Sequence, residues 1–574
     1  MSAKTQAIFV LVFAGILVSP SQPLSRFSSQ SFQRGVNGGA TCVACTVIVA
    51  LTEQLSEIYN ETAVRAFDRL CNFLPVDYQI YCQTFGSYFV PLIIDSLEKK
   101  VTPDVVCHRI GLCYTQAGKP ECTIFPPPKG GVKAHVDRIA KRDTKLRYLR
   151  ADICDLPGVK ELCEWIKKIF DQHDPALDAD GDYYSIAQTL RGVSWRGKDC
   201  DDSNPGIHPG AKPIDSDIYV DSNCNGIYGV DGASGTPYED LLCGNSSSRG
   251  VAILGDSVGA HFHLPEEWFD SSLISVEAFK DLTFILENEI DWPEFSAATG
   301  YKNSTYSVTK GPTHSMYHSM WERNRCNHRD YQNIAVNGAR SSTMLSSIVT
   351  SLARNPSSDT PLLIIYALIG NDVCNGHPDT FAHMTTPEEM RESFTKTLQY
   401  LETHVPTGSH IVVNGLVDGR ILFNNLHDRI HPIGRFRNDV TYSDFYDYLY
   451  CLEVSPCNGW LTSNETVRDK TTERAKLLNS VLKNVSTSYQ SQVFDVHYFD
   501  FPIEDAIKTW EANGGEAWQL IEPVDGFHTN QYGQALTAQV MWDYLQTNLP
   551  DVIGEENPHN SDIQSLFGDQ GGYE

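Results

Sequence analysis

The chain has few basic residues for its size and, after its N-terminus, no long apolar run. It carries 45 lysines and arginines against 72 aspartates and glutamates, a formal net charge of -27 at pH 7. Nucleic acids and anionic membranes attract proteins with a basic surface, so this composition argues against both as general partners. Beyond residue 21 no run predicts a membrane-spanning helix. From the acidic net charge we expect no nucleic-acid partner.

The N-terminus and the cysteines indicate export. Lys4, the apolar stretch 7–18 and the small residues after it are typical of a secretory signal peptide over residues 1–21. Sixteen cysteines in an exported chain predict disulfides, and the even number leaves no obligatory free thiol. Glycosylation sequons occur at Asn60, Asn245, Asn303, Asn464 and Asn484. We expect a protein that is secreted or held in lysosomal or endosomal vesicles.

A chain of 574 residues is too long for one hydrophobic core, so we expect several domains. The first expected domain spans residues 38–123. It contains six cysteines: Cys42, Cys45, Cys71, Cys82, Cys107 and Cys113. Apolar residues such as Ile48, Leu51 and Leu55 recur on one helical face, and small helical domains need covalent staples. A redox or zinc role for the first Cys-x-x-Cys is the alternative, but no thioredoxin-like strand and helix surround it.

This six-cysteine pattern resembles a saposin B-type domain, an all-α bundle that opens onto lipid. The resemblance implies the bridges Cys42 to Cys113, Cys45 to Cys107 and Cys71 to Cys82. Since six cysteines allow many pairings, this connectivity comes from the family and not from the spacing.

Residues 124–153 have the composition of a linker, with a proline triplet, a glycine pair and a basic stretch of Lys141, Arg142, Lys145, Arg147 and Arg150. We expect a propeptide that is removed by proteolysis; an exposed linker that is never cut is the alternative. Cleavage would leave a small and a large subunit that need a covalent tie. Cys122 lies outside the six cysteines above, so it can bridge to Cys451 or Cys457.

Residues 154–244 include an acidic region in which oxygen-bearing side chains recur at short intervals. They are Asp178, Asp180, Asp182, Tyr184, Asp199, Asp201, Asp202, Asp217, Asp221, Asn223 and Asn225. Oxygen ligands at every second residue of a turn-rich loop suit calcium, and Gly181 permits a tight turn. A solvated acidic loop is the alternative, but it does not explain the alternation around embedded cysteines. The region lacks the helix pair and terminal glutamate of an EF-hand, and it resembles thrombospondin-type calcium loops. We predict Ca²⁺ as the cofactor of these residues.

Residues 245–574 alternate apolar runs with helical patterns. Strands are expected at 251–254, 362–369, 411–416 and 493–498, and helices at 386–401 and 472–483. Several runs are apolar on both faces, which is typical of a buried parallel sheet. Strands that alternate with crossover helices predict an α/β fold with sites at the C-terminal ends of the strands.

Four motifs in this region carry candidate catalytic residues. Ser257 follows an apolar run in Gly-Asp-Ser, Gly338 lies in Val-Asn-Gly, Asn371 lies in Gly-Asn-Asp, and Asp525 precedes His528 in Val-Asp-Gly-Phe-His. A serine is a weak nucleophile that needs a base and a group to orient that base, roles suited to His528 and Asp525. The backbone of Ser257 and Gly338 and the amide of Asn371 are suitable oxyanion donors.

Each motif alone also occurs in ordinary turns, but their joint order resembles the SGNH (GDSL) hydrolases, which have a flavodoxin-like parallel sheet with flanking helices. Asp256 is expected to hold the turn rather than act as a base. His261 and His263 either line the site or lie on the surface.

The whole arrangement resembles the acyloxyacyl hydrolase family. The matching stretches are 255–263, 326–333, 521–528 and 567–572, with Val258 where the family usually has alanine. The resemblance implies a serine esterase that removes secondary acyl chains from lipid A of bacterial lipopolysaccharide and so detoxifies it. It also implies phospholipids as further substrates and a saposin-like domain that shelters acyl chains at a membrane or micelle surface. The alternatives are a GDSL-type phospholipase or carbohydrate esterase with a tethering saposin module, and a lipid-binding protein without activity.

Overall fold

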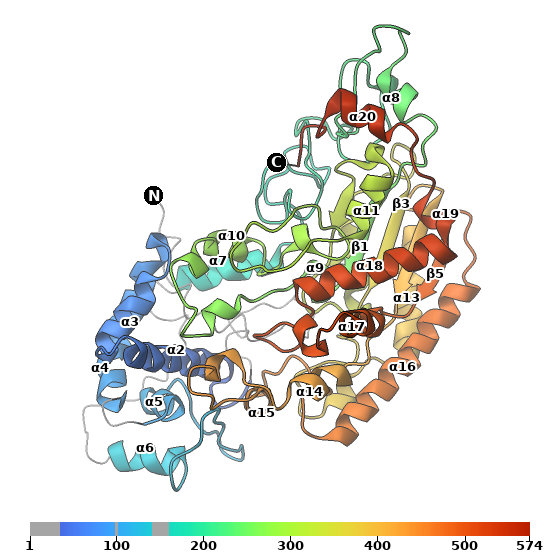
Figure 1. Cartoon of the computed structure of the whole chain (residues 1–574). Coiled ribbons are helices and arrows are strands. Elements are labelled where there is room, and N and C mark those ends of the chain that lie inside the picture. Colours follow the sequence, from blue (N-terminus) through green and yellow to red (C-terminus); the bar gives the residue numbers. More distant parts are fainter. Residues whose placement is uncertain (1–34, 98–100, 141–159, 574) are drawn as a thin grey trace.

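The computed structural model describes residues 35–97, 101–140 and 160–573 (Figure 1). The expected signal peptide and the basic stretch that begins at Lys141 lie outside these residues. The small helices of the N-terminal part lie together beside a larger part that contains the sheet, and the acidic loops lie at the far end of the larger part, near its C-terminus (Figure 1).

A five-stranded parallel sheet forms the centre of the larger part. Its strands are β1 (Gly250–Gly255), β2 (Tyr331–Asn333), β3 (Leu362–Ala367), β4 (Ser409–Asn414) and β5 (Phe494–Phe499). Their order is β2-β1-β3-β4-β5, the doubly wound order of flavodoxin-like folds. The parallel sheet and its four longer strands are therefore confirmed. Sequence analysis missed β2, because its three residues include two polar side chains and are too few to show a period.

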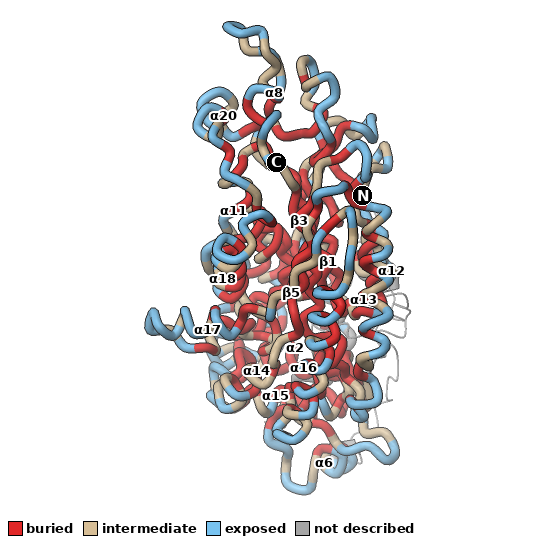
Figure 2. Tube along the Cα trace, turned by 90° about the vertical axis from the view of Figure 1, so that its right-hand side faces the viewer, coloured by how far each residue is buried: buried red, intermediate tan, exposed pale blue. Residues whose placement is uncertain are grey.

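Helices cover both faces of the sheet, which explains why β1 is buried along its whole length. Val251 and Ile253 pack with one group of helices, while Ala252 and Leu254 pack with the other. The first group is α11 (Met316–Arg323) and α18 (Gln531–Asn548). The second group is α12 (Met344–Ser347), α13 (Pro387–Leu401) and α16 (Glu465–Ser488). In Figure 2, α12 and α13 lie on the opposite side of the strands from α11 and α18.

The two expected helices are present. Thr386 and Glu389 form a reciprocal capping box at the start of α13, which ends at Leu401 as expected. The second helix, α16, is longer than the expected 472–483, because Asn464 caps its N-terminus. Shorter helices complete this part: α7 (Lys160–Asp171), α8 (Tyr238–Leu242), α9 (Ser257–Ala260), α10 (Leu282–Glu287), α14 (Arg420–Leu426), α15 (Tyr442–Cys451), α17 (Ile503–Ala512), α19 (Pro550–Ile553) and α20 (Asn560–Phe567).

The N-terminal part is a helical module closed by three disulfides. Its helices are α2 (Gly39–Ile58), α3 (Ala63–Asn72), α4 (Val76–Leu97), α5 (Pro103–Ile110) and α6 (Val132–Ala140). The disulfides Cys42–Cys113, Cys45–Cys107 and Cys71–Cys82 are the pairs that the saposin resemblance implies. Among the described residues α2 is, by length and composition, apolar enough to cross a membrane, whereas sequence analysis expected no such run after the N-terminus. Since 83% of its apolar window is buried, α2 packs as the core helix of this module.

The module shares its core with the larger part. One hydrophobic cluster runs from α2 into α15, and Thr46 Oγ1 lies 3.0 Å from the hydroxyl of Tyr448 within it. Gln54 donates to the carbonyl of Ile433 at 2.8 Å. A disulfide joins Cys122 to Cys451, one of its two candidate partners. The other candidate, Cys457, is bonded to Cys374.

The described part of the expected linker, 124–140, is folded against the module. The Asp104 carboxylate accepts from the backbone of Ile124 and Phe125 at 3.1 and 3.0 Å. Glu121 accepts from Val132 at 2.8 Å at the start of α6. This segment therefore extends the module rather than hanging free.

Candidate active site

The candidate nucleophile lies on a sharp turn between β1 and α9. Asp256 is the N-cap of α9, and its carboxylate accepts from the backbone of Val258 at 3.0 Å. The same carboxylate accepts from Ile369, in the loop after β3, at 2.8 Å. Asp256 thus ties the nucleophile turn to the neighbouring strand end, in line with the turn-holding role expected for it. Ser257 is 2% exposed.

Ser257, His528 and Asp525 form one hydrogen-bonded chain. Ser257 Oγ lies 2.7 Å from His528 Nε2, and His528 Nδ1 lies 2.5 Å from Asp525 Oδ2. The other oxygen of Asp525 accepts from the backbone of His528 at 3.1 Å, so the short loop aims both side chains at the serine. Burial lowers the pKa of His528, but the Asp525 carboxylate outweighs it, and the net shift is upward. The arrangement matches a nucleophile, a base and an orienting carboxylate.

The two further candidate residues lie differently. Asn371 lines the same cavity as Ser257 and donates its amide to Asp256 at 3.3 Å. Gly338 has a left-handed φ of 73° in a turn beyond β2, where Ala339 bonds back to Val336. It is not among the residues that line the cavity at Ser257. The structure thus brings Asn371 to the serine, and it leaves Gly338 in the adjoining turn.

A narrow apolar cavity of about 50 Å³ ends at the Ser257 side chain. Its walls come from the loops after the strands and from α17, on which Ile503 and Ile507 lie four residues apart on one face. Its other apolar lining residues are Val258, Ile369, Val417, Ile421, Leu422, Trp460, Phe501, Ala517, Leu520, Ile521 and Phe527. A cavity with these walls suits a hydrocarbon chain whose reactive end lies at the serine.

A larger cleft of about 880 Å³ borders this cavity and shares Ile521 with it. The cleft is lined by apolar and aromatic residues, including Trp510 and Trp518, together with charged residues of both signs: Glu266, Lys310, Asp428, Arg429 and Arg435. It gives the narrow cavity an amphipathic entrance.

His261 and His263 are both buried rather than on the surface. Burial lowers the pKa of His261 to about 3, so its ring is neutral. His263 lines the larger cleft and lies 2.8 Å from the carboxylate of Glu522. Sequence analysis left the placement of these histidines open and did not identify Glu522.

Five of the expected calcium ligands form two groups of three converging carboxylates that share Asp180: Asp178, Asp180 and Asp202, and Asp180, Asp182 and Asp199. The Oδ2 atoms of Asp180, Asp182 and Asp199 are buried and have no hydrogen-bond partner. Burial, reinforced by the neighbouring carboxylates, raises the pKa of Asp182 and Asp199 to about 7. Crowded carboxylates with free oxygens are the donor set that a hard cation such as Ca²⁺ binds.

Two other expected ligands are engaged elsewhere. The hydroxyl of Tyr184 accepts from Gln332 of β2 at 2.9 Å, and the ring of Tyr184 stacks on His208. Asp201 accepts from the hydroxyl of Ser203 at 2.6 Å.

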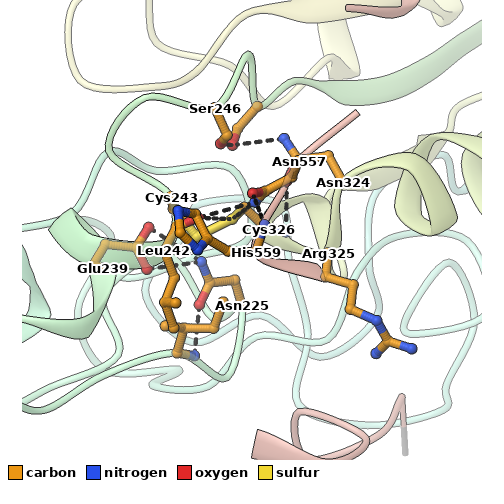
Figure 3. The surroundings of a disulfide bond; sticks show 12 residues. Asn225, Glu239, Leu242, Cys243, Ser246, Asn324, Arg325, Cys326, Asn557 and His559 are labelled. Atoms are coloured by element: carbon orange, nitrogen blue, oxygen red, sulfur yellow. Dashed lines mark hydrogen bonds between the residues drawn. A yellow bond between two sulfur atoms is a disulfide. The ribbon is translucent and has the colours of Figure 1, made fainter. Parts of the chain in front are cut away.

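The remaining expected ligands, Asp217, Asp221, Asn223 and Asn225, surround Glu239. Asn223 and Asn225 both donate to its carboxylate, at 3.0 and 3.2 Å (Figure 3 shows Asn225 and Glu239). Burial, with Asp217 and Asp221 nearby, raises the pKa of Glu239 to about 8. Sequence analysis missed Glu239, because it lies on α8, outside the alternating run.

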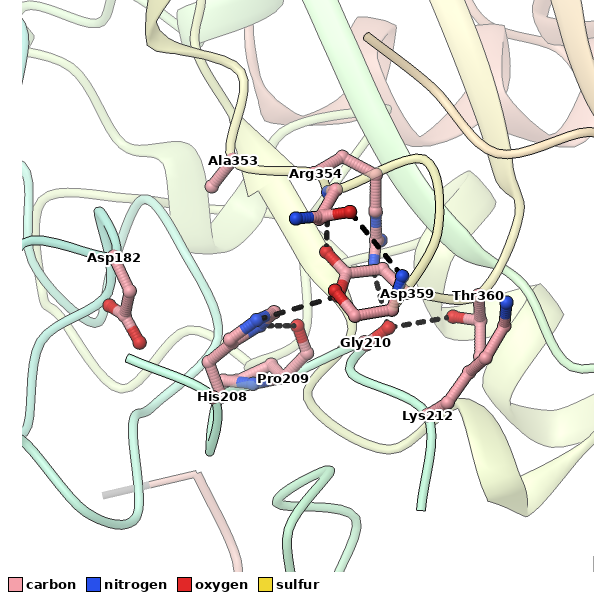
Figure 4. Close-up of polar contacts among 12 residues, drawn as sticks. Asp182, His208, Pro209, Gly210, Lys212, Ala353, Arg354, Asp359 and Thr360 are labelled. Carbon is pink, nitrogen blue, oxygen red and sulfur yellow. Dashed lines mark hydrogen bonds and ion pairs between the residues drawn. The ribbon is translucent and has the colours of Figure 1, made fainter. Parts of the chain in front are cut away.

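The acidic loops are anchored to the larger part. The disulfide Cys243–Cys326 follows α8 (Figure 3). Beside it, Asn557 donates to Leu242 at 3.0 Å. A second anchor holds the acidic loops at Gly210, whose carbonyl accepts from Arg354 at 2.9 Å (Figure 4).

Comparison with known proteins agrees with this architecture. A saposin-like domain profile matches residues 41–164, and a GDSL-like lipase/acylhydrolase profile matches residues 251–541. The chain is 43% identical to the acyloxyacyl hydrolase of Homo sapiens, over 97% of this chain and 98% of that protein. It is 43% identical to the acyloxyacyl hydrolase of Mus musculus over 99% of both chains. It is 42% identical to that of Oryctolagus cuniculus, over 97% of this chain and 99% of that protein.

Proposed function

The chain belongs to the acyloxyacyl hydrolase family, and from this we propose that it is a serine esterase that removes secondary fatty acyl chains from lipid A of bacterial lipopolysaccharide. The observation that carries the proposal is the bonded chain of Ser257, His528 and Asp525 at the end of an apolar cavity. Removal of acyl chains from lipid A would detoxify the lipopolysaccharide.

In the proposed reaction, Ser257 Oγ attacks the ester carbonyl while His528 Nε2 takes its proton. Asp525 holds Nδ1 of His528 and stabilises the imidazolium that forms. The backbone N–H of Ser257 and the amide of Asn371 would stabilise the oxyanion, and Gly338, in the adjoining turn, is the third candidate donor. His528 then gives this proton to the oxygen of the primary chain, which leaves as a hydroxyl. Water next attacks the acylated serine by the same steps and releases the fatty acid.

The two cavities fit the two ends of such a substrate. The narrow cavity, with a volume of about 50 Å³, would hold the part of the secondary chain next to the ester, and burial of each CH₂ is favourable by about 0.8 kcal/mol. The larger cleft would hold the rest of the lipid, with the saposin-like module presenting it from a membrane or micelle surface. Phospholipids have the same ester-linked chains and would be further substrates.

We also propose Ca²⁺ as a structural cofactor. The two groups of converging carboxylates that share Asp180 would hold it, and the group around Glu239 is a second candidate. The bound cation would neutralise carboxylates that otherwise repel one another, and so fix the loops.

Maturation would follow export to a secretory or lysosomal compartment. Cleavage in the basic stretch after residue 140 would separate a small from a large subunit, and the Cys122–Cys451 disulfide would keep them joined.

The function is tested by fatty acid release from purified lipopolysaccharide, measured by mass spectrometry for the wild type and Ser257→Ala. We expect release of secondary chains by the wild type, and a loss of about a thousandfold or more in the variant. Primary chains should stay attached. A folded wild type that releases no secondary chain would overturn the proposed substrate, and a Ser257→Ala enzyme with full activity would overturn the nucleophile.

A further inference from the structure

A buried histidine and glutamate join the two chain segments that carry the catalytic residues. His263 lies shortly after α9, which begins with Ser257, and Glu522 opens the loop that carries Asp525 and His528. His263 Nδ1 lies 2.8 Å from each carboxylate oxygen of Glu522. His263 Nε2 lies 3.0 Å from the carbonyl oxygen of Val308.

The partners of His263 determine its charge. When Glu522 is ionised, both ring nitrogens face acceptors, a carboxylate and a carbonyl, so each nitrogen must carry a proton to make its bond. His263 is therefore an imidazolium when both bonds are formed. Glu522 is 1% exposed, and a buried carboxylate needs such a partner. Burial lowers the pKa of His263, but Glu522, together with the Val308 carbonyl, outweighs it and the net shift is upward; burial also raises the pKa of Glu522.

Glu522 is also bonded directly to the catalytic loop. Its N–H donates to the carbonyl of His528 at 2.8 Å, and its carbonyl accepts from Gly526 at 3.0 Å. On the α15 side, Tyr446 donates to Gly526 and His431 bonds to the carbonyl of Val524, at 2.8 and 2.7 Å. The Glu522 side chain thus fixes one end of this loop to the segment of the nucleophile.

We propose that His263 and Glu522 are positioning residues: their imidazolium–carboxylate pair holds His528 against Ser257. When His263 loses a proton at alkaline pH, the pair breaks and activity ends. This proposal rests on the catalytic roles proposed above. When His263 gives its proton to solvent, one ring nitrogen turns a lone pair toward an acceptor, and the bond to Glu522 or to Val308 is lost. The acid limb of the pH profile would belong to His528, and the alkaline limb to the pair.

Other charged or titratable groups near His263 do not replace this role. Glu266 and Glu267 lie on the η3 turn (Glu266–Trp268), and both pair with Lys310. The ring of His261 lies 6.3 Å away and is neutral above pH 3 or so, because burial lowers its pKa to about 3. The ring of His528 lies 4.8 Å from that of Phe262, the chain neighbour of His263.

The test is the pH profile of kcat for Glu522→Gln, measured between pH 6 and 9. Along the alkaline limb of its profile, the wild type should lose about tenfold in kcat per pH unit. In the variant, the amide NH₂ can donate to Nδ1 of a neutral His263, so the pair is kept without a titrating proton. We expect a lower kcat, little change in KM, and activity that stays within about twofold on the alkaline side.

His263→Gln is the second variant, in case Glu522→Gln does not fold, and it should lose the alkaline limb in the same way. His431→Gln is the matched control: it alters another buried histidine bonded to the same loop, so it can lower kcat but should leave the alkaline limb in place.

The profile is recorded on a soluble nitrophenyl ester and on lipopolysaccharide. Failure on lipopolysaccharide alone would count against the proposed substrate. An alkaline limb that is unchanged in the folded variants on the nitrophenyl ester would overturn the positioning role of the pair.

Discussion

At the scale of single residues, the candidate triad depends on hydrogen bonds that fix one proton. Asp525 accepts from His528 Nδ1, which leaves Nε2 free to take the proton of Ser257. Asp525 is three residues before His528, and the same spacing occurs in the exposed pair His559 and Asp562, 3.1 Å apart on the surface. Burial against the serine, and not the spacing, distinguishes the candidate catalytic pair from the exposed one.

Replacing Asp525 by asparagine should lower kcat by about 10⁴, because the amide favours the wrong tautomer of His528. The measurement is steady-state ester hydrolysis, with circular dichroism to verify folding. Asp562→Asn removes the carboxylate of the exposed pair and should leave kcat unchanged. An Asp525→Asn enzyme within tenfold of the wild type would contradict the assigned role.

At the scale of elements, a buried ion pair fixes the acidic region to the sheet. Arg191 makes two bonds to Glu289, at 2.6 and 2.8 Å, and one to the carbonyl of Ala335 after β2. The side chains of Arg191 and Glu289 are 2% and 0% exposed. Loss of one partner leaves the other charge buried without compensation.

Arg191→Ala should therefore lower the free energy of unfolding by about 3–5 kcal/mol, measured by denaturant titration. Lys280→Ala breaks the exposed pair with Glu277 and should change it by no more than about 1 kcal/mol. If both substitutions lowered the free energy of unfolding equally, burial would not explain how much the Arg191–Glu289 pair stabilises the fold.

The acidic loops should depend on calcium for their stability. A ligand that binds only the folded state at a hundred times its Kd stabilises by about 2.7 kcal/mol, so chelation should lower the melting temperature. Asp182→Asn with Asp199→Asn should reduce this response, because both oxygens belong to the converging group. Calorimetry with and without chelator measures both effects, and a melting curve that chelation does not move would refute calcium binding.

At the scale of the whole molecule, one disulfide and one shared core hold the module to the larger part. Thr46 and Gln54 of α2 contact Tyr448 and Ile433, respectively, so the contact does not depend on the chain connection through the linker. The Cys122–Cys451 disulfide makes the attachment covalent.

Processed protein should therefore run as one band on a denaturing gel without reductant and as two bands with it. In Cys451→Ser the processed subunits should separate without reductant. Cys457→Ser breaks the Cys374–Cys457 disulfide within the larger part and should not release the small subunit. Release of the small subunit from unreduced wild type would show that the disulfide does not form.

The sequence by itself determined the local features of this protein. Apolar runs, several of them apolar on both faces, indicated the four longer strands, Thr386 and Glu389 indicated the start of α13, and the order of the four motifs indicated the hydrolase family. These features depend on residues within a few positions of one another, where period and capping are fixed by backbone geometry. The disulfides of the module followed from family resemblance.

Only the tertiary structure decided which distant residues meet. It joined Cys122 to Cys451, placed Glu239 beside Asn225, and paired His263 with Glu522 across 259 residues of chain. It also left Gly338 outside the cavity that Asn371 lines. No local period encodes such contacts, because they depend on how the crossover helices pack and on where each loop leaves the sheet.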